Sequence, residues 1–138
     1  MLFSDKELNF DIPKVMGIIN LTPDSFSDGG RFISKKSLKV DRSKVLKEIE
    51  AMENSGASFI DIGAESTRPN SVRISVQEEM DRLMPILEEI KNIRAIVSID
   101  SSKGEVIFEA IKKGVNLIND INSLEDKNSL ELVKKYNL

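Results

Sequence analysis

Three side chains that accept hydrogen bonds stand at the ends of short apolar runs. Asn20 follows the run 15–19, Asp100 follows the run 95–99, and Asn119 interrupts the run 116–121. Carboxylate and amide oxygens gathered at one place would hold a neutral heterocycle that is rich in N–H donors. These side chains can act together only if the fold brings the ends of the runs together.

The apolar runs predict buried strands. Residues 15–19, 58–64, 95–99 and 116–121 are each short and rich in β-branched or other apolar side chains. Strands of this kind, which carry apolar side chains on both faces, are typical of a parallel sheet covered by helices.

A helix is predicted after each strand. Asp41 is a candidate N-cap and Gly56 a candidate left-handed end of the first helix, while Ser75 and Glu78 have the spacing of a capping box. Pro85 predicts a kink in the second helix. The third helix is expected before Gly114, and the fourth over residues 127–136.

The strand-helix unit occurs four times, so the class is α/β and residues 1–138 form one domain. The pattern alone does not choose between a doubly wound sheet and a barrel. In both, functional groups collect where the strands end, and a pterin or purine edge would fit Asn20, Asp100 and Asn119. The simpler alternative is that Asp100 and Asp120 cap helices or loops and that Asp61 is a hydrogen-bonded structural carboxylate.

Two long polar segments, 21–40 and 65–74, follow the first two strands. Both are rich in turn-forming residues and therefore predict loops at the same end of the sheet. They carry Arg31, Arg68 and Arg73, which suit a phosphate or carboxylate, although solvated surface charge explains them equally well.

Composition excludes several classes of chemistry. The chain has no Cys and no His, so it offers no thiol nucleophile, no Ser-His pair and no imidazole base. The 20 Lys and Arg and 23 Asp and Glu give a net charge of −3 without a basic patch, so we expect no nucleic acid or membrane partner. Residues 1–11 lack the pattern of a signal peptide, which predicts a cytoplasmic protein.

Four segments carry a resemblance to a known family. They are MGIINLTPDSFSDGG at 16–30, GAESTRPN at 63–70, VSIDSSKGEV at 97–106 and NLINDI at 116–121. In order and spacing they resemble the N-terminal half of the dihydropteroate synthases. This resemblance implies a (β/α)8 TIM barrel of which the chain holds about the first four βα units. It also implies transfer of a pterinylmethyl group from 7,8-dihydropterin-6-ylmethyl diphosphate to p-aminobenzoate, in folate biosynthesis.

The same resemblance implies roles for individual residues. Asp100 and Asn119 would hydrogen-bond the pterin, Ile121 would pack on it, Thr67 would contact the diphosphate and Asn20 would help to hold Mg²⁺. Four residues of the two loops, namely Phe26, Asp28, Ser66 and Pro69, would complete a p-aminobenzoate pocket that sulfonamides also occupy. We predict that Asp28 favours the cation developing at the methylene carbon and that Asp100 assists through the ring.

Half a barrel has strands with unpaired edges. We therefore expect the isolated chain to be inactive, and either to associate with other copies through those edges or to fold poorly. One alternative function is a pterin-binding methyltransferase domain, which would not release diphosphate when p-aminobenzoate is added. The other is a noncatalytic half-barrel that serves as a binding or assembly module, whose turnover a C-terminal half would not restore.

Overall fold

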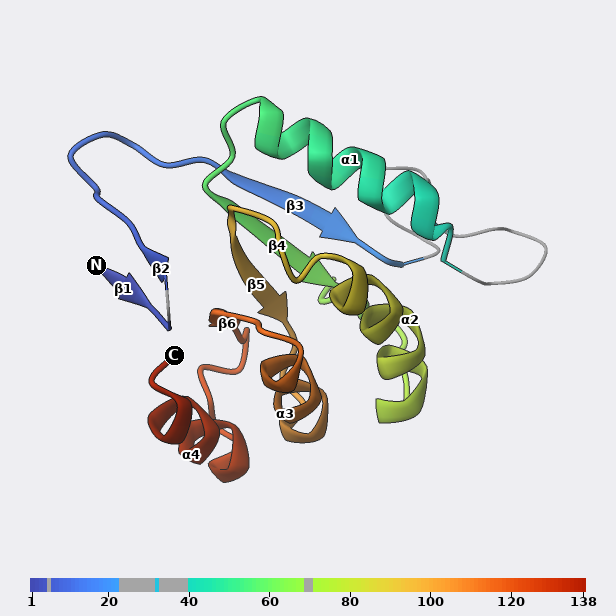
Figure 1. Ribbon diagram of the computed structural model, residues 1–138. Coiled ribbons are helices and arrows are strands. Elements are labelled where there is room, and N and C mark those ends of the chain that lie inside the picture. Colours follow the sequence, from blue (N-terminus) through green and yellow to red (C-terminus); the bar gives the residue numbers. More distant parts are fainter. Residues whose placement is uncertain (5, 23–31, 33–39, 69–70) are drawn as a thin grey trace.

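The computed structural model of the chain describes residues 1–4, 6–22, 32, 40–68 and 71–138 (Figure 1). A hairpin comes first, and four strand-helix units follow it. The strands are β1 Leu2–Phe3, β2 Lys6–Glu7, β3 Met16–Asn20, β4 Phe59–Gly63, β5 Ile96–Asp100 and β6 Leu117–Asn119. The helices are α1 Arg42–Asn54, α2 Val76–Glu89, α3 Gly104–Lys112 and α4 Lys127–Tyr136.

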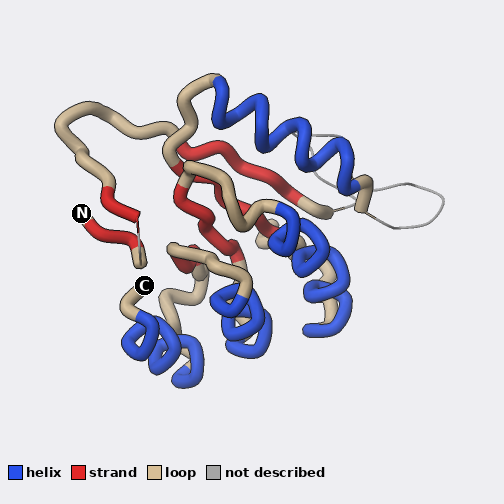
Figure 2. Tube along the Cα trace, in the orientation of Figure 1, coloured by secondary structure: helices blue, strands red, loops and turns tan. Residues whose placement is uncertain are grey.

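The four predicted strands form one parallel sheet in the order β3-β4-β5-β6. This confirms the α/β class. Within the described residues, β3 and β6 are the edge strands of this sheet. Figure 2 shows the helices arranged in sequence order around the sheet.

The local signals at the helix ends are largely confirmed. Asp41 accepts a hydrogen bond from the Lys44 N–H at the start of α1, and Ser75 accepts one from the Glu78 N–H at the start of α2. Gly56 has φ +95°, which a residue with a side chain rarely adopts. Helix α2 continues through Pro85 to Glu89.

One face of the sheet packs against the helices. Ile19, Ile60, Ile62 and Ile99 are fully buried there, together with apolar residues of α1, α2 and α3. Burying such side chains is the main favourable contribution to folding. Among the described residues, no helix combines the length and apolar character needed to cross a bilayer.

The other face of the sheet carries the alternate residues of each strand, because successive side chains point to opposite faces. The register places them in three rows across the sheet. The first row is Met16, Phe59 and Ile96, the second is Ile18, Asp61, Ser98 and Leu117, and the third is Asn20, Gly63, Asp100 and Asn119. Only the third row lies at the carboxyl ends of the strands.

The hairpin β1-β2 is the one element that the sequence patterns did not predict. The Phe3 ring meets the Phe59 ring edge-on at 5.4 Å between centroids, and the Phe10 ring lies 6.3 Å from that of Phe59. Lys6 Nζ donates to the carbonyl oxygens of Ile93 and Ala95, just before β5. The hairpin therefore lies where the strands begin (Figure 1), which leaves the opposite end for a site.

Candidate active site at the carboxyl ends of the strands

The predicted hydrogen-bonding side chains meet in one row. Asn20 pairs with Gly63, Gly63 with Asp100, and Asp100 with Asn119 across four neighbouring strands. A Cβ added at Gly63 would lie 3.1 Å from Asp100 Oδ2, so the Asp100 side chain lies over β4 and would have to shift slightly to admit a side chain there. The structure thus brings Asn20, Asp100 and Asn119 together, as the sequence predicted.

Asp61 orients the amide of Asn119. Asn119 Nδ2 donates to Asp61 Oδ2 at 3.0 Å, and Asp61 itself is only 3% exposed in the row beneath. Because the NH2 group of Asn119 is used in this way, its amide oxygen is the atom left to accept from a ligand. Asp61 is therefore hydrogen-bonded, as expected, although its Oδ1 is buried with no partner among the described residues.

Asp100 lies in an acidic environment. Burial raises its pKa to about 6, and the charges of Asp61, Glu79, Asp120 and Glu65 add to the effect. Asp100 is not a helix cap, because α3 begins at Gly104 with Lys103 in the N-cap position. The alternative prediction that Asp100 caps the following helix is therefore wrong.

Asp120, by contrast, has the simpler role. Its two carboxylate oxygens accept from the backbone N–H groups of Asn122 and Leu124, so it closes the turn after β6. The neighbouring Ile121 is 63% exposed and offers an apolar surface at the same end of the sheet.

The loop after β4 is held at both of its ends. Glu65 Oε2 accepts from the Ile74 N–H at 2.9 Å and from Lys103 Nζ at 2.6 Å, while Lys103 Nζ also pairs with Glu79. Burial disfavours the charged carboxylate of Glu65 and the charged ammonium group of Lys103. The hydrogen bonds with Lys103 and Ile74 nevertheless lower the pKa of Glu65. The hydrogen bonds that Lys103 makes with Glu65 and Glu79 likewise raise the pKa of Lys103.

A polar cavity of about 240 Å³ lies between this loop and the segment after β5. Ser66, Thr67 and Arg68 line one side of it, and Asp100, Ser101 and Ser102 line another. Thr67 is exposed at the surface of the loop, where its hydroxyl can reach a ligand. Arg73 and Ile121 also contribute to the lining.

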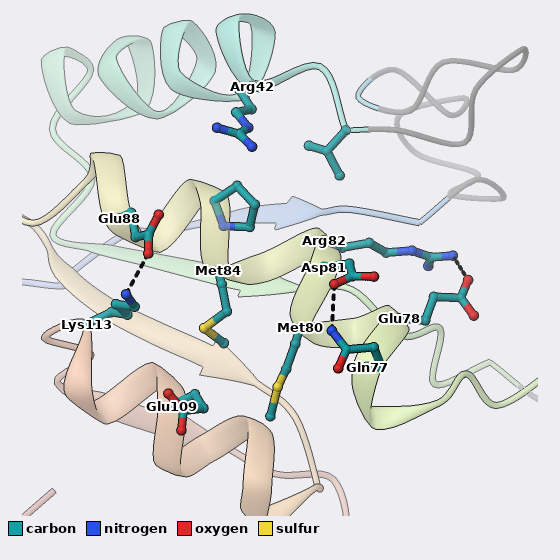
Figure 3. A pocket seen from close by; sticks show the side chains of 12 residues that line it. Arg42, Gln77, Glu78, Met80, Asp81, Arg82, Met84, Glu88, Glu109 and Lys113 are labelled. Atoms are coloured by element: carbon teal, nitrogen blue, oxygen red, sulfur yellow. Dashed lines mark hydrogen bonds and ion pairs between the residues drawn. The ribbon is translucent and has the colours of Figure 1, made fainter.

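A larger hollow, of about 780 Å³, lies on the outside of the sheet along α2 (Figure 3). Its wall contains Glu78 paired with Arg82, Glu88 paired with Lys113, and Gln77 hydrogen-bonded to Asp81. These polar groups already have partners within the protein. We therefore place the candidate site at the smaller cavity, where acceptors and hydroxyls converge.

Three predicted site residues, Phe26, Asp28 and Pro69, lie outside the described residues, as does Arg31. Residues that the sequence reasoning left out of the site are Glu79 and Lys103. The sequence carries no clear sign of Glu79, because an acidic residue in the first turn of a helix is ordinary. In the structure, however, Glu79 is fully buried. A charged residue among the apolar positions of an amphipathic helix is a weak signal that could have pointed to it.

The fold and the site together define a class of protein. A parallel sheet covered by helices, with acceptors and hydroxyls at its carboxyl ends, is typical of the ligand-binding α/β folds. The acceptors Asp100 and Asn119 favour a ligand rich in N–H donors, and the hydroxyls favour a polar or anionic extension of that ligand.

Comparison with known proteins identifies the family within this class. Residues 16–138 match the family described as Pterin binding enzyme, and the chain belongs to this family. It is 45% identical over 136 residues to the dihydropteroate synthase of Haemophilus influenzae, covering 98% of this chain and 47% of that protein. The chain thus spans less than half the length of this relative.

Solved structures show the same relationship. The Yersinia pestis dihydropteroate synthase, in complex with a sulfonamide drug, superposes with a TM-score of 0.88 at 40% identity, over 100% of this chain and 48% of that one. The Burkholderia cenocepacia enzyme, complexed with 7,8-dihydropteroate, gives 0.78 at 33% identity, over 95% and 41%. The four strand-helix units are therefore those of a TIM barrel, which confirms the predicted barrel.

The raised pKa of Asp100 predicts a pH-dependent stability. Its pKa in the folded chain, about 6, exceeds the unfolded value of about 3.9, so ionisation of this group destabilises the fold. The stabilising contribution is complete below the unfolded pKa and is lost as the pH rises through about 6.

Asp100→Asn should therefore raise the free energy of unfolding at pH 8 by about 1 kcal/mol, after allowance for the partial exposure of the group. At pH 4 the variant and the wild type should be equally stable. Urea unfolding at both pH values measures this difference. A variant that is no more stable than the wild type at pH 8 would contradict the assignment.

Proposed function

We propose that this chain provides the pterin side of a dihydropteroate synthase active site. The observation that carries the proposal is the row formed by Asn20, Asp100 and Asn119, in a chain that belongs to the pterin binding enzyme family. The reaction would join 7,8-dihydropterin-6-ylmethyl diphosphate to p-aminobenzoate. Its products would be 7,8-dihydropteroate and diphosphate, in folate biosynthesis.

Pterin recognition would use acceptors. The pterin ring presents N–H and amino groups along one edge, and the Asp100 carboxylate together with the Asn119 amide oxygen would accept from them. Accepting two charge-assisted hydrogen bonds favours the ionised form of Asp100 and so offsets the effect of its acidic neighbours. The exposed side chain of Ile121 would cover one face of the ring.

The diphosphate would extend toward the loop after β4. Thr67 would donate from its hydroxyl to a phosphate oxygen in the polar cavity. In the reaction the bond between the methylene carbon and the diphosphate oxygen breaks and diphosphate leaves, the arylamine nitrogen bonds to that carbon, and the nitrogen then loses a proton. The electron-rich ring supports the cationic carbon, so no nucleophile from the protein is needed.

Magnesium would neutralise the departing diphosphate. Asn20 would contribute its amide oxygen, which is the kind of ligand that Mg²⁺ accepts. Among the residues that the structure describes, no group of three or more acidic residues is arranged to hold a metal unaided. The donor set therefore fits an ion held mainly by substrate phosphates and water, with Asn20 as the protein ligand.

The p-aminobenzoate pocket is proposed from the resemblance. It would be completed by Phe26, Asp28, Ser66 and Pro69, of which only Ser66 lies in the described part of the chain. Sulfonamides would compete for the same pocket, since a drug of this kind is bound by the Yersinia pestis relative. Association between copies and a cytoplasmic location stay predictions from the sequence.

Calorimetric titration of the 138-residue chain with the pterin diphosphate and Mg²⁺ tests the pterin site. We expect saturable binding that Asn119→Ala weakens by about ten-fold or more, because the variant loses one acceptor to the ring. Asn92→Ala, at an exposed position remote from the strand ends, is the matched control and should bind like the wild type. Equal binding by all three chains would remove Asn119 from the site.

Asp28→Ala tests the proposed catalytic role. In a chimaera that continues this chain with the C-terminal half of the Haemophilus influenzae enzyme, the variant should release diphosphate about ten-fold more slowly or worse once p-aminobenzoate is added. The physical reason is the loss of a negative charge that favours the developing cation. Unchanged turnover would show that Asp28 has no such role.

A further inference from the structure

An ionic cluster at the carboxyl ends of β4 and β5 has no part in the chemistry described above. Lys103 Nζ lies 2.6 Å from Glu65 Oε2 and also pairs with Glu79 Oε2. The side chains are 17% exposed for Lys103, 14% for Glu65 and 1% for Glu79. Each of the three comes from a different segment, namely the loop after β4, the first turn of α2 and the segment before α3.

The cluster fastens the two ends of the loop to each other. Glu65 Oε2, at the start of the loop, also accepts from the N–H of Ile74, at its end, at 2.9 Å. Inside the loop, Ser71 Oγ donates to the carbonyl oxygens of Ser66 and Arg68 at 2.6 and 2.8 Å. The described parts of the loop are therefore bound to each other, and Glu65 connects them through Lys103 to the strand ends.

The positions of Glu65 and Glu79 depend on the charge of Lys103. Two carboxylates face a single ammonium group, and the second oxygen of Glu79 has no partner among the described residues. Without the ammonium, two carboxylates that are shielded from solvent would lie close together, which is strongly unfavourable. Glu79 is fully buried on a helix and cannot leave. Glu65, at the edge of a loop, can turn to solvent, and its hydrogen bond to Ile74 would break as it does so.

We propose that Lys103 is a positioning residue that holds the 65–74 loop in place through Glu65 and Glu79, so that Ser66 and Thr67 face Asp100 across the polar cavity. The clamp itself needs no ligand. Its consequence for substrate binding rests on the proposed function, since it is Thr67 that would contact the diphosphate.

Arg82 supports the same arrangement from the other side. Its guanidinium donates to the carbonyl oxygen of Ala64 at 2.8 Å and pairs with Glu78, as Figure 3 shows for that pair. The residue directly before Glu65 is thus fixed to α2, and the loop begins from a rigid point. A change at Lys103 should therefore free the loop without moving β4.

Amide hydrogen exchange of the 138-residue chain without ligand tests the clamp. In Lys103→Met the Ile74 N–H should exchange at least about ten-fold faster than in the wild type, while the amides of β4 keep their rates. Lys103→Arg, which retains the cation, should restore most of the protection. Lys113→Met removes the pair between Lys113 and the half-exposed Glu88, and it should leave Ile74 unchanged.

Two results would overturn the proposal: unchanged exchange at Ile74 in Lys103→Met, or exchange at Ile74 in the wild type at the rate of an unprotected peptide. If Lys103→Met raises exchange throughout the chain, Glu65→Gln decides, because it removes one charge and leaves the shape. Faster exchange confined to 65–74 in that variant supports the clamp, and wild-type rates overturn it.

A second measurement separates the clamp from the proposed function. If both are right, Lys103→Met should weaken binding of the pterin diphosphate by about ten-fold relative to Lys113→Met. A wild-type chain that protects Ile74 but does not bind the pterin diphosphate would count against the proposed function alone. If the Ile74 N–H exchanges faster in Lys103→Met but binding of the pterin diphosphate is unchanged, the position of the loop does not matter for the ligand.

Discussion

The parallel register of the four-stranded sheet is the constraint on which the site depends. It places Asn20, Gly63, Asp100 and Asn119 side by side, although they are far apart in the sequence. A shift of one residue in any strand would turn that strand's polar side chain toward the helices. The glycine in the row is part of the constraint, because a Cβ at Gly63 would press on the Asp100 side chain at 3.1 Å and shift it.

Concentrating acceptors at the strand ends has an electrostatic cost. Burial and the charges of Asp61, Glu79, Asp120 and Glu65 together raise the pKa of Asp100 to about 6. The fold reduces the cost with one ammonium group and one amide, namely Lys103 between two carboxylates and Asn119 on Asp61. Under the proposed function, a bound pterin would supply further donors and reduce this cost.

The rest of the molecule isolates this end of the sheet. Helices cover one face, and the aromatic cluster of Phe3, Phe10 and Phe59 covers the end where the strands begin. What stays open is the end of the sheet where the strands finish, beside the loop after β4. The two solved relatives are more than twice as long as this chain, which covers 48% and 41% of them.

The sequence by itself determined the strands, the helix caps at Asp41 and Ser75, the left-handed Gly56 and the meeting of Asn20, Asp100 and Asn119. These features follow from periodicity and capping, which are local, and from the rule that parallel strands end together. It did not predict β1 and β2, because strands of two residues are too short to show a period. Only the tertiary structure paired Lys103 with Glu65 and Glu79 and oriented Asn119 through Asp61. It also raised the pKa of Asp100, through burial and nearby charges. Each of these features depends on groups that are close in space but distant along the chain.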